Sequence, residues 1–253
     1  MLDKYKIRIY IVKFVIIKSN FMKRPFAIIY FAFVVLFFSS CASNDTANSD
    51  TVKQSEIYQS YTITYDAGDL ELSSTAFFRF GGSTGTTLNL VKPSSITFNG
   101  TEMALGKNIF SGTFYEINQQ IQPAKSYTFV FTDTDKKTYT NTSSIEEIAI
   151  SEYPASINKI KGFKVSWKGA PVQQDEKVYV SLEGKDFMNC SSSTNIVGAT
   201  SVEISPDILK DLKPGDGNIV LKREKSCNLK EATHLGGNIT ITYVAKKVST
   251  KVE

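Results

Sequence analysis

Residues 122–131, Gln-Pro-Ala-Lys-Ser-Tyr-Thr-Phe-Val-Phe, decide the fold class. Bulky side chains stand at every second position from Tyr127 to Phe131, and this alternation is typical of a strand with one buried face. The proline near the start of the stretch cannot donate to a strand ladder, so it marks the turn before the strand. Similar short runs recur from Tyr61 to Val244. The sequence therefore predicts an all-β chain.

The predicted strands form two series along the chain. The first series is Tyr61–Tyr65, Thr75–Phe80, Ile96–Met103, Phe110–Tyr115, Tyr127–Phe131 and Lys137–Asn141, and the second is Glu147–Ser151, Phe163–Trp167, Lys177–Glu183, Thr200–Ile204, Asn218–Arg223 and Asn238–Val244. Asn99-Gly100 predicts a type I′ hairpin turn, because both residues tolerate positive φ. Asp133–Lys136 predicts a second tight turn.

A corner in each series resembles the corners of immunoglobulin-like and fibronectin-like sandwiches. In residues 122–131, Tyr127 takes the place of the tyrosine corner, whose hydroxyl hydrogen-bonds to backbone upstream. In the second series, Ser205-Pro206 begins a helical turn and Pro214-Gly215 ends it before a strand. The resemblance implies a sandwich fold for each series, with Trp167 in the centre of the second.

The size of each series predicts two β-sandwich domains, residues 60–144 and 145–247, followed by a tail at 248–253. A single large sandwich is the alternative, because all-β domains can reach about 200 residues.

The N-terminal segment indicates export. Phe26–Phe38 has thirteen residues without charge and follows the basic Met22-Lys-Arg-Pro25. A membrane-spanning helix needs about 20 apolar residues, so the run fits the apolar region of a signal peptide. We expect residues 1–40 to be a leader, with Met22 as the true start. The alternative is one long N-terminal anchor.

Phe38-Ser-Ser-Cys41 resembles the lipobox of bacterial lipoproteins. The resemblance implies cleavage before Cys41, acylation of Cys41, and a lipid anchor in the outer membrane with the chain on its periplasmic face or at the cell surface. The alternative is a plain thiol beside the membrane.

Residues 41–59 contain almost no large apolar side chain and therefore predict a flexible tether. Within it, Asp45-Thr-Ala47 and Asp50-Thr-Val52 resemble the O-glycosylation sites of extracytoplasmic proteins from Bacteroidetes. The resemblance implies Thr46 and Thr51 as candidate acceptors, and an ordinary polar tether is the alternative.

With Cys41 acylated, Cys190 and Cys227 remain as an even pair. An oxidising compartment permits a disulfide between them, which the sequence predicts. Two independent buried thiols are the alternative.

The charge of the chain is concentrated in the leader. Residues 1–40 carry seven basic residues against Asp3, which leaves 22 basic and 24 acidic residues from Cys41 onward, a net charge of −2. Binding to nucleic acid requires a concentrated positive field, so we expect no nucleic-acid partner.

Catalytic and metal-binding patterns are absent from the sequence. His234 is the single histidine, and no ligand spacing surrounds it. Asp133-Thr-Asp135 is followed by lysines without the glycine and closing glutamate of a calcium loop. We therefore predict no catalytic residue, no metal and no cofactor. Several glutamates occupy the polar face of predicted strands, namely Glu71, Glu102, Glu116, Glu183 and Glu203.

The sequence as a whole favours a non-enzymatic binding or structural lipoprotein with a protein or glycan partner. Loops at the ends of sandwiches carry recognition in such folds, and the candidate contact loops are Gly81–Gly85 and Lys185–Ser193. A carbohydrate-binding lipoprotein of a glycan-uptake system is the alternative, and a glycoside hydrolase that uses two carboxylates ranks below it.

Overall fold

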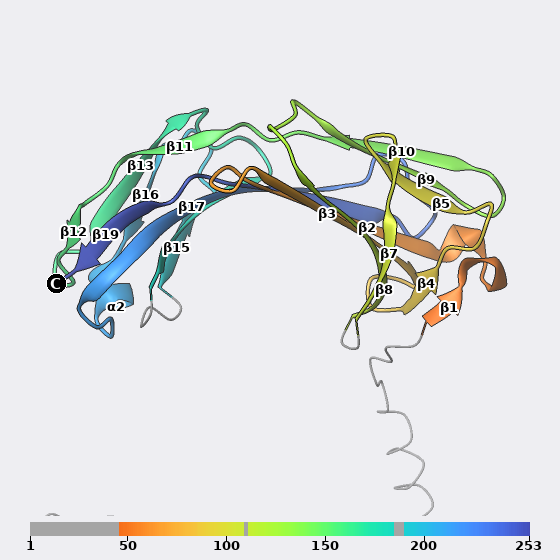
Figure 1. The fold of residues 1–253 in the computed structure, drawn as a ribbon, viewed down its shortest axis with the longest axis horizontal. Helices are drawn as coiled ribbons and strands as arrows, with labels where there is room; N and C mark the ends of the chain where they lie inside the picture. Colours follow the sequence, from red (N-terminus) through yellow and green to blue (C-terminus); the bar gives the residue numbers. More distant parts are fainter. Residues whose placement is uncertain (1–45, 109–110, 185–189) are drawn as a thin grey trace, which may run out of the picture. The chain divides into compact units, whose positions relative to one another are not determined.

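The computed structural model describes residues 46–108, 111–184 and 190–253 (Figure 1). Within these ranges the elements are strands, apart from the 3-10 turns η1 (Ser49–Thr51) and η2 (Gln54–Glu56) and the helical turn α2 (Pro206–Leu209). The predicted all-β class is confirmed. No helix in these ranges has the length and apolar character to span a membrane. The predicted leader and Cys41 lie outside the described residues.

The largest sheet runs in the order β1-β4-β3-β2-β18-β17-β14-β15, with β8 and β7 beside β3 and with β19 and β12 beside β17. Its strands are β1 (Thr46–Asn48), β2 (Ile57–Asp66), β3 (Glu71–Phe80), β4 (Thr86–Asn89), β7 (Ala104–Asn108), β8 (Gly112–Gln120), β12 (Ser156–Ile157), β14 (Glu176–Glu183), β15 (Ser191–Thr194), β17 (Gly215–Asn228), β18 (Gly237–Val244) and β19 (Val248–Val252). β2 and β18 pair in parallel, so both halves of the chain contribute to one sheet. The boundary at 144/145 falls between strands, and independent folding of each half stays a prediction.

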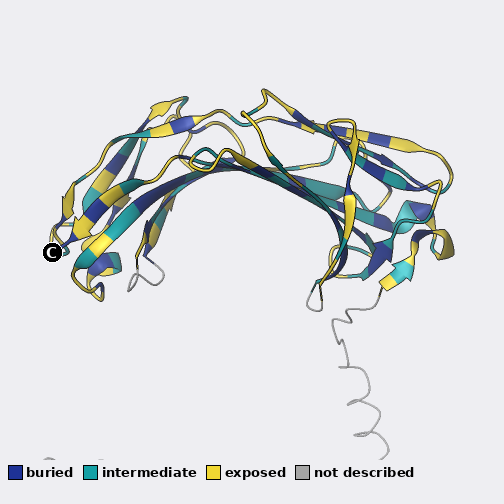
Figure 2. Ribbon diagram, in the orientation of Figure 1, coloured by how far each residue is buried: buried dark blue, intermediate teal, exposed yellow. Residues whose placement is uncertain are grey.

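Two smaller sheets cover one face of the large sheet (Figure 1). The first contains β5 (Ser95–Phe98), β6 (Thr101–Glu102), β9 (Tyr127–Thr132) and β10 (Thr138–Ser143), and the second contains β11 (Ile148–Glu152), β13 (Phe163–Gly169) and β16 (Ser201–Ile204). Burial alternates along the long strands, as the banding of β2 in Figure 2 shows, because one side of each strand faces these sheets and the other faces solvent.

Aromatic packing between the sheets forms the core of the first half. Tyr61 stacks on Phe129 with ring centroids 4.4 Å apart, and Phe78 lies 4.4 Å from Phe131. The predicted tyrosine corner is confirmed, since the Tyr127 hydroxyl accepts a 3.1 Å hydrogen bond from the backbone N–H of Ala124.

The predicted turns and the buried tryptophan are also found. Asn99 and Gly100 have φ of 48° and 83°, as a type I′ hairpin requires. The Asp133 carboxylate accepts a 2.9 Å hydrogen bond from the Lys137 N–H and closes the second turn. Trp167 is buried on β13.

The chain from residue 46 to 59 differs from the expected flexible tether. It forms β1, η1, η2 and the start of β2. Buried Ser49 accepts a hydrogen bond from the Val91 N–H at 2.8 Å, and the Gln54 amide bonds to Ser49 O and the Thr134 N–H at 2.7 and 3.2 Å. Polar side chains here meet specific partners across the fold, which composition alone does not reveal.

The expected tail at 248–253 is also structured. β19 pairs with β17 along Gly215–Ile219 and in parallel with β12, and Val252 is fully buried. Two long-range strand partners order a segment that is too short to show a clear periodicity.

The predicted Cys190–Cys227 disulfide is wrong in this structure, where both thiols are free. The Cys190 carbonyl accepts from the N–H of Leu182, which pairs with Ile219 of β17. Cys227 lies eight residues further along β17, about 26 Å away, whereas a disulfide needs Cα atoms within about 7 Å. Cys190 therefore lies near one end of the β14–β17 pair, and Cys227 lies in β17 near the other end.

We expect two reactive thiols per chain, besides Cys41, when the unfolded protein is titrated with a thiol reagent in the absence of reductant. Purification under oxidising conditions serves as the control, because an accessible disulfide would form there. Fewer than two thiols in that sample would contradict the separation of the two cysteines.

Candidate functional site

A row of side chains with polar ends crosses the covered face of the large sheet, within its hydrophobic core. Tyr65 of β2 pairs with Leu72 of β3 on one side and with Tyr243 of β18 on the other. Tyr243 pairs in turn with Arg223 of β17, which pairs with Val178 of β14. Residues at paired positions share a face. Two tyrosines and an arginine therefore lie in a row across the strands between Leu72 and Val178, and the tyrosines belong to the same core as these two residues.

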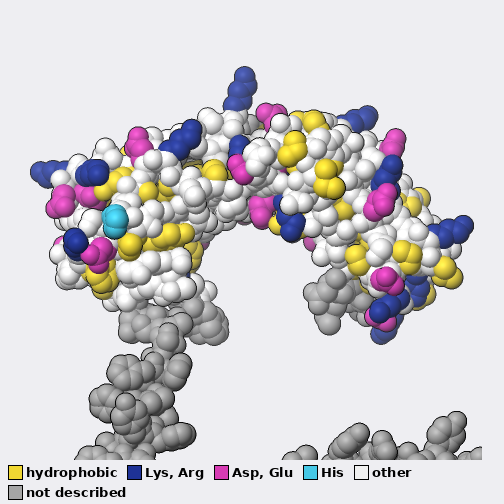
Figure 3. Space-filling model, turned by 180° about the vertical axis from the view of Figure 1, so that it is seen from behind, with side chains coloured by type: hydrophobic (Ala, Val, Ile, Leu, Met, Phe, Trp, Pro, Cys, Tyr) yellow, Lys and Arg dark blue, Asp and Glu magenta, His cyan; other side chains and the backbone are white. Residues whose placement is uncertain are grey.

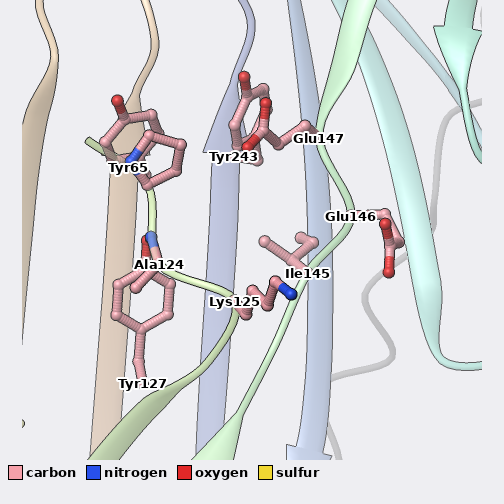
Figure 4. A pocket seen from close by; sticks show the side chains of 9 residues that line it. Tyr65, Ala124, Lys125, Tyr127, Ile145, Glu146, Glu147 and Tyr243 are labelled. Atoms are coloured by element: carbon pink, nitrogen blue, oxygen red, sulfur yellow. The ribbon is translucent and has the colours of Figure 1, made fainter.

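A cavity of about 290 Å³ opens over this row (Figure 4). β2 and β18 supply its floor, the connection between β8 and β9 forms one wall, and the connection between β10 and β11 forms another. We call it the tyrosine pocket, and its lining residues are Tyr65, Pro123, Ala124, Lys125, Tyr127, Ile145, Glu146, Glu147 and Tyr243.

The Tyr65 hydroxyl is the unusual group of the tyrosine pocket. The residue is 2% exposed, and its hydroxyl has no hydrogen-bond partner. Its ring stacks on Tyr243, with centroids 5.7 Å apart and an interplanar angle of 29°. A buried polar group without a partner costs about 1–3 kcal/mol, so each such group calls for an explanation. The hydroxyl has no accessible surface in the free protein, so a ligand hydroxyl or carbonyl would supply the missing bond once a neighbouring side chain of the pocket moves aside.

Burial and nearby carboxylates keep these phenols protonated. Desolvation, reinforced by Glu147, raises the pKa of Tyr243 to about 12. Desolvation, followed by Tyr127 and Glu147, also raises the pKa of Tyr65. The pocket therefore offers phenol hydroxyls as donors at neutral pH, beside the acceptor oxygens of Glu147.

Arg223 fixes one wall of the tyrosine pocket from behind. Its guanidinium is fully buried, lies 3.1 Å from the Glu176 carboxylate, and donates to the carbonyls of Ala170 and Pro171 at 2.8 and 2.6 Å. A further hydrogen bond of 3.4 Å reaches the carbonyl of Glu146. Burial lowers the pKa of Arg223, and Glu176 opposes that shift. The pair ties the connection between β10 and β11 to the sheet.

The sequence did not single out Tyr65, Tyr243 or Arg223 as a site. One signal for the tyrosines was present: Thr-Ile-Thr-Tyr occurs at 62–65 and again at 240–243. The two copies lie side by side in register, which brings their tyrosines together. No comparable signal marks Arg223, because its partners are mostly backbone carbonyls.

The residues considered in the sequence lie elsewhere. His234 is exposed, and Asp133 closes a turn. Among the described residues, no three His, Cys, Asp or Glu side chains could share a metal ion. Acidic and basic side chains are interspersed on the face shown in Figure 3, with no extended patch of one sign.

The two candidate O-glycosylation acceptors differ in their surroundings. The Thr46 hydroxyl is bonded to Thr87 and Thr113 at 3.1 and 3.0 Å, whereas exposed Thr51 bonds only to the Asn48 carbonyl, at 2.8 Å. Their glycosylation stays a prediction. Of the contact loops, Gly81–Gly85 joins β3 to β4, while residues 185–189 of the second loop lie outside the described residues.

No protein-family model and no curated protein matches the chain. One similar solved structure comes from work on the host cell surface retention of a 1.5-MDa bacterial ice-binding adhesin. The alignment covers 78% of this chain and 64% of that chain, at 11% sequence identity and a TM-score of 0.23.

A second is SGBP-B of the Bacteroides ovatus mixed-linkage glucan utilization locus, in complex with a mixed-linkage heptasaccharide. The alignment covers 72% of this chain and 53% of the SGBP-B chain, at 9% sequence identity and a TM-score of 0.18. The chain thus spans less than two thirds of either structure, and at these scores the likeness says nothing of what the chain binds.

Proposed function

We propose that the chain is a non-enzymatic binding protein that holds a neutral sugar unit in the tyrosine pocket. The observation that carries the proposal is the buried, unpartnered hydroxyl of Tyr65 at the pocket floor. In the same proposal, acylated Cys41 anchors the chain in the outer membrane, a part that rests on the lipobox-like Phe38-Ser-Ser-Cys41.

The chemistry of the lining favours a sugar over a purely apolar ligand. The phenols of Tyr65 and Tyr243 and the ammonium of Lys125 donate, while Glu147 accepts. A sugar hydroxyl does both and can satisfy such a mixed set, and the faces of sugar rings pack against apolar surface such as Pro123. At about 290 Å³, the pocket is near the lower limit for small-molecule sites and suits one unit of a glycan.

The carboxylates of the pocket do not form a catalytic pair. Figure 4 shows Glu147 beside Tyr243, whereas the Glu146 side chain points away from the tyrosines. Glycoside hydrolysis needs two carboxyl groups that flank one bond. Binding without turnover is therefore the function that this arrangement supports best.

Tyr65→Phe should weaken sugar binding by about 3–10-fold, the effect of one neutral hydrogen bond. An array of neutral oligosaccharides identifies the strongest ligand, and calorimetry then compares the variants. Because the hydroxyl has no partner in the free protein, the same substitution should leave the free energy of unfolding unchanged or raise it.

Tyr58→Phe is the matched control. Tyr58 lies on the opposite face of β2 and donates to Asn238 at 3.1 Å, so its loss should leave affinity unchanged. Equal affinities for wild type and Tyr65→Phe, or no binding anywhere on the array, would overturn the sugar assignment. Release of reducing sugar during the binding assay would instead establish hydrolysis.

A further inference from the structure

The connection between Cys41 and the folded chain is short. β1 begins at Thr46, so residues 42–45 are all that separate it from the proposed acylation site. A fully extended chain covers at most about 3.6 Å per residue, which limits the reach from Cys41 to Thr46 to about 18 Å. The expected tether of residues 41–59 would have allowed several times that distance.

β1 is fixed firmly in the sheet. It pairs in parallel with β4, from Thr46–Thr87 to Asn48–Asn89. The Thr46 hydroxyl also bonds to the hydroxyls of Thr87 and Thr113 at 3.1 and 3.0 Å. Thr46 therefore holds a defined place at one end of the large sheet.

The same end of the sheet carries the loop Gly81–Gly85. This loop leads from Phe80 into Thr86, the first residue of β4, and the Gly81 N–H donates to the carbonyl of Glu56 at 3.1 Å. Because β1 runs parallel to β4, the chain that precedes Thr46 approaches from the side of this loop. Ser83 and Thr84 at its tip are exposed and uncharged.

The tyrosine pocket lies far from this end. β2 starts at Ile57, opposite Phe80, and Tyr65 follows eight residues later, about 26 Å along the strand. From Asp66 the sheet continues through Val244 and Lys222 to Gly215 of β17. Gly215 pairs with β19, which pairs with β12, so the other end of the sheet lies about 50 Å from Phe80 along the strands. The sheet is arched, and both of its ends bend toward the same side (Figure 1).

We infer that the end of the large sheet formed by β1, the start of β4 and the loop Gly81–Gly85 rests on the lipid surface of the membrane. The inference rests on the proposed acylation of Cys41. The short connection holds this end at the bilayer, and the strands β2 and β3 lead away from it and display the tyrosine pocket. Gly81–Gly85 then faces lipid and is not a recognition loop for a soluble partner.

Charge does not drive this contact. The loop itself has no charged residue, and the neighbouring Lys53 and Glu56 pair with each other at 2.9 Å. The Arg79 guanidinium donates to the Gly85 carbonyl of the loop at 3.2 Å and lies over the Phe77 ring, so it is held by the protein. The acyl chains supply the affinity for the membrane. The placement should therefore persist at high salt, which would weaken contacts made through charge.

A photoreactive benzophenone amino acid at Ser83 or at Ala149 of the full chain tests the placement in isolated membranes. Both positions are exposed, and Ala149 lies on β11, on the convex side of the arched sheet (Figure 1). We expect the Ser83 probe to form lipid adducts several-fold more than the Ala149 probe. A Gly/Ser spacer of about 20 residues between Ser43 and Asn44, with a root-mean-square length of about 25 Å, should reduce the Ser83 yield to that of Ala149.

Equal yields at the two positions, or a Ser83 yield that the spacer leaves unchanged, would overturn the inference. The mass of the N-terminal peptide separates this result from failure of the anchor: a Cys41 peptide without acyl chains refutes both the anchor and the placement. Sugar binding by the tyrosine pocket is measured on detergent-solubilised Cys41→Ser protein and does not depend on either outcome.

Discussion

Arg223→Met should lower the free energy of unfolding by about 3–5 kcal/mol, the usual cost of removing one partner from a buried ion pair. The substitution leaves the buried Glu176 carboxylate without its cation and removes two short hydrogen bonds to the carbonyls of Ala170 and Pro171. Equilibrium unfolding in urea measures the change.

Two further variants show whether the buried pair causes the loss. Lys222→Met changes the neighbouring residue, which points to the uncovered face of β17, and should change stability by less than about 0.5 kcal/mol. Adding Glu176→Leu to Arg223→Met removes the stranded charge and should recover part of the lost stability. Equal unfolding curves for Arg223→Met and Lys222→Met would show that the buried pair does not contribute to stability.

Deletion of residues 248–253 should lower the free energy of unfolding by at least about 3 kcal/mol. The deletion removes fully buried Val252, worth about 2 kcal/mol, and the bond from the Thr250 hydroxyl to the Pro154 carbonyl, worth about 1 kcal/mol. It also exposes the edges of β12 and the first part of β17.

The matched control replaces the exposed residues of β19 and keeps the strand. Ser249→Ala with Lys251→Ala should leave stability nearly unchanged, because both side chains face solvent. If residues 248–253 were a disordered tail, their deletion would leave the free energy of unfolding unchanged. That outcome would contradict the pairing of β19.

The strands that the sequence predicts are those whose own residues carry the signal. Tyr127–Phe131 and Lys177–Glu183 alternate over enough positions to show a buried face, and Asn99-Gly100 fixes its turn through backbone conformation. β1 and β15 are short and polar, and they exist because a distant strand offers hydrogen bonds. Local pattern does not contain that information.

The tyrosine pocket depends even more on long-range pairing. The pattern of β2 identifies Tyr65 as a residue of the buried face, which is correct. The parallel register between residues 62–65 and 240–243 places it against Tyr243, and that pairing joins strands nearly 180 residues apart. The backbone carbonyls of Ala170 and Pro171 accept hydrogen bonds from Arg223. Because these contacts use backbone atoms, the residue types at these two positions do not indicate them.

The course of β2 determines how the protein responds to mechanical force. The strand starts at Ile57, near the end of the sheet that carries β1, and reaches the tyrosine pocket at Tyr65, bonded to β3 along its whole length and to β18 from Gln59. In the proposed arrangement, a pull between acylated Cys41 and a ligand in the pocket would act nearly parallel to these strands. Their hydrogen bonds would then be strained together in shear instead of opening one after another.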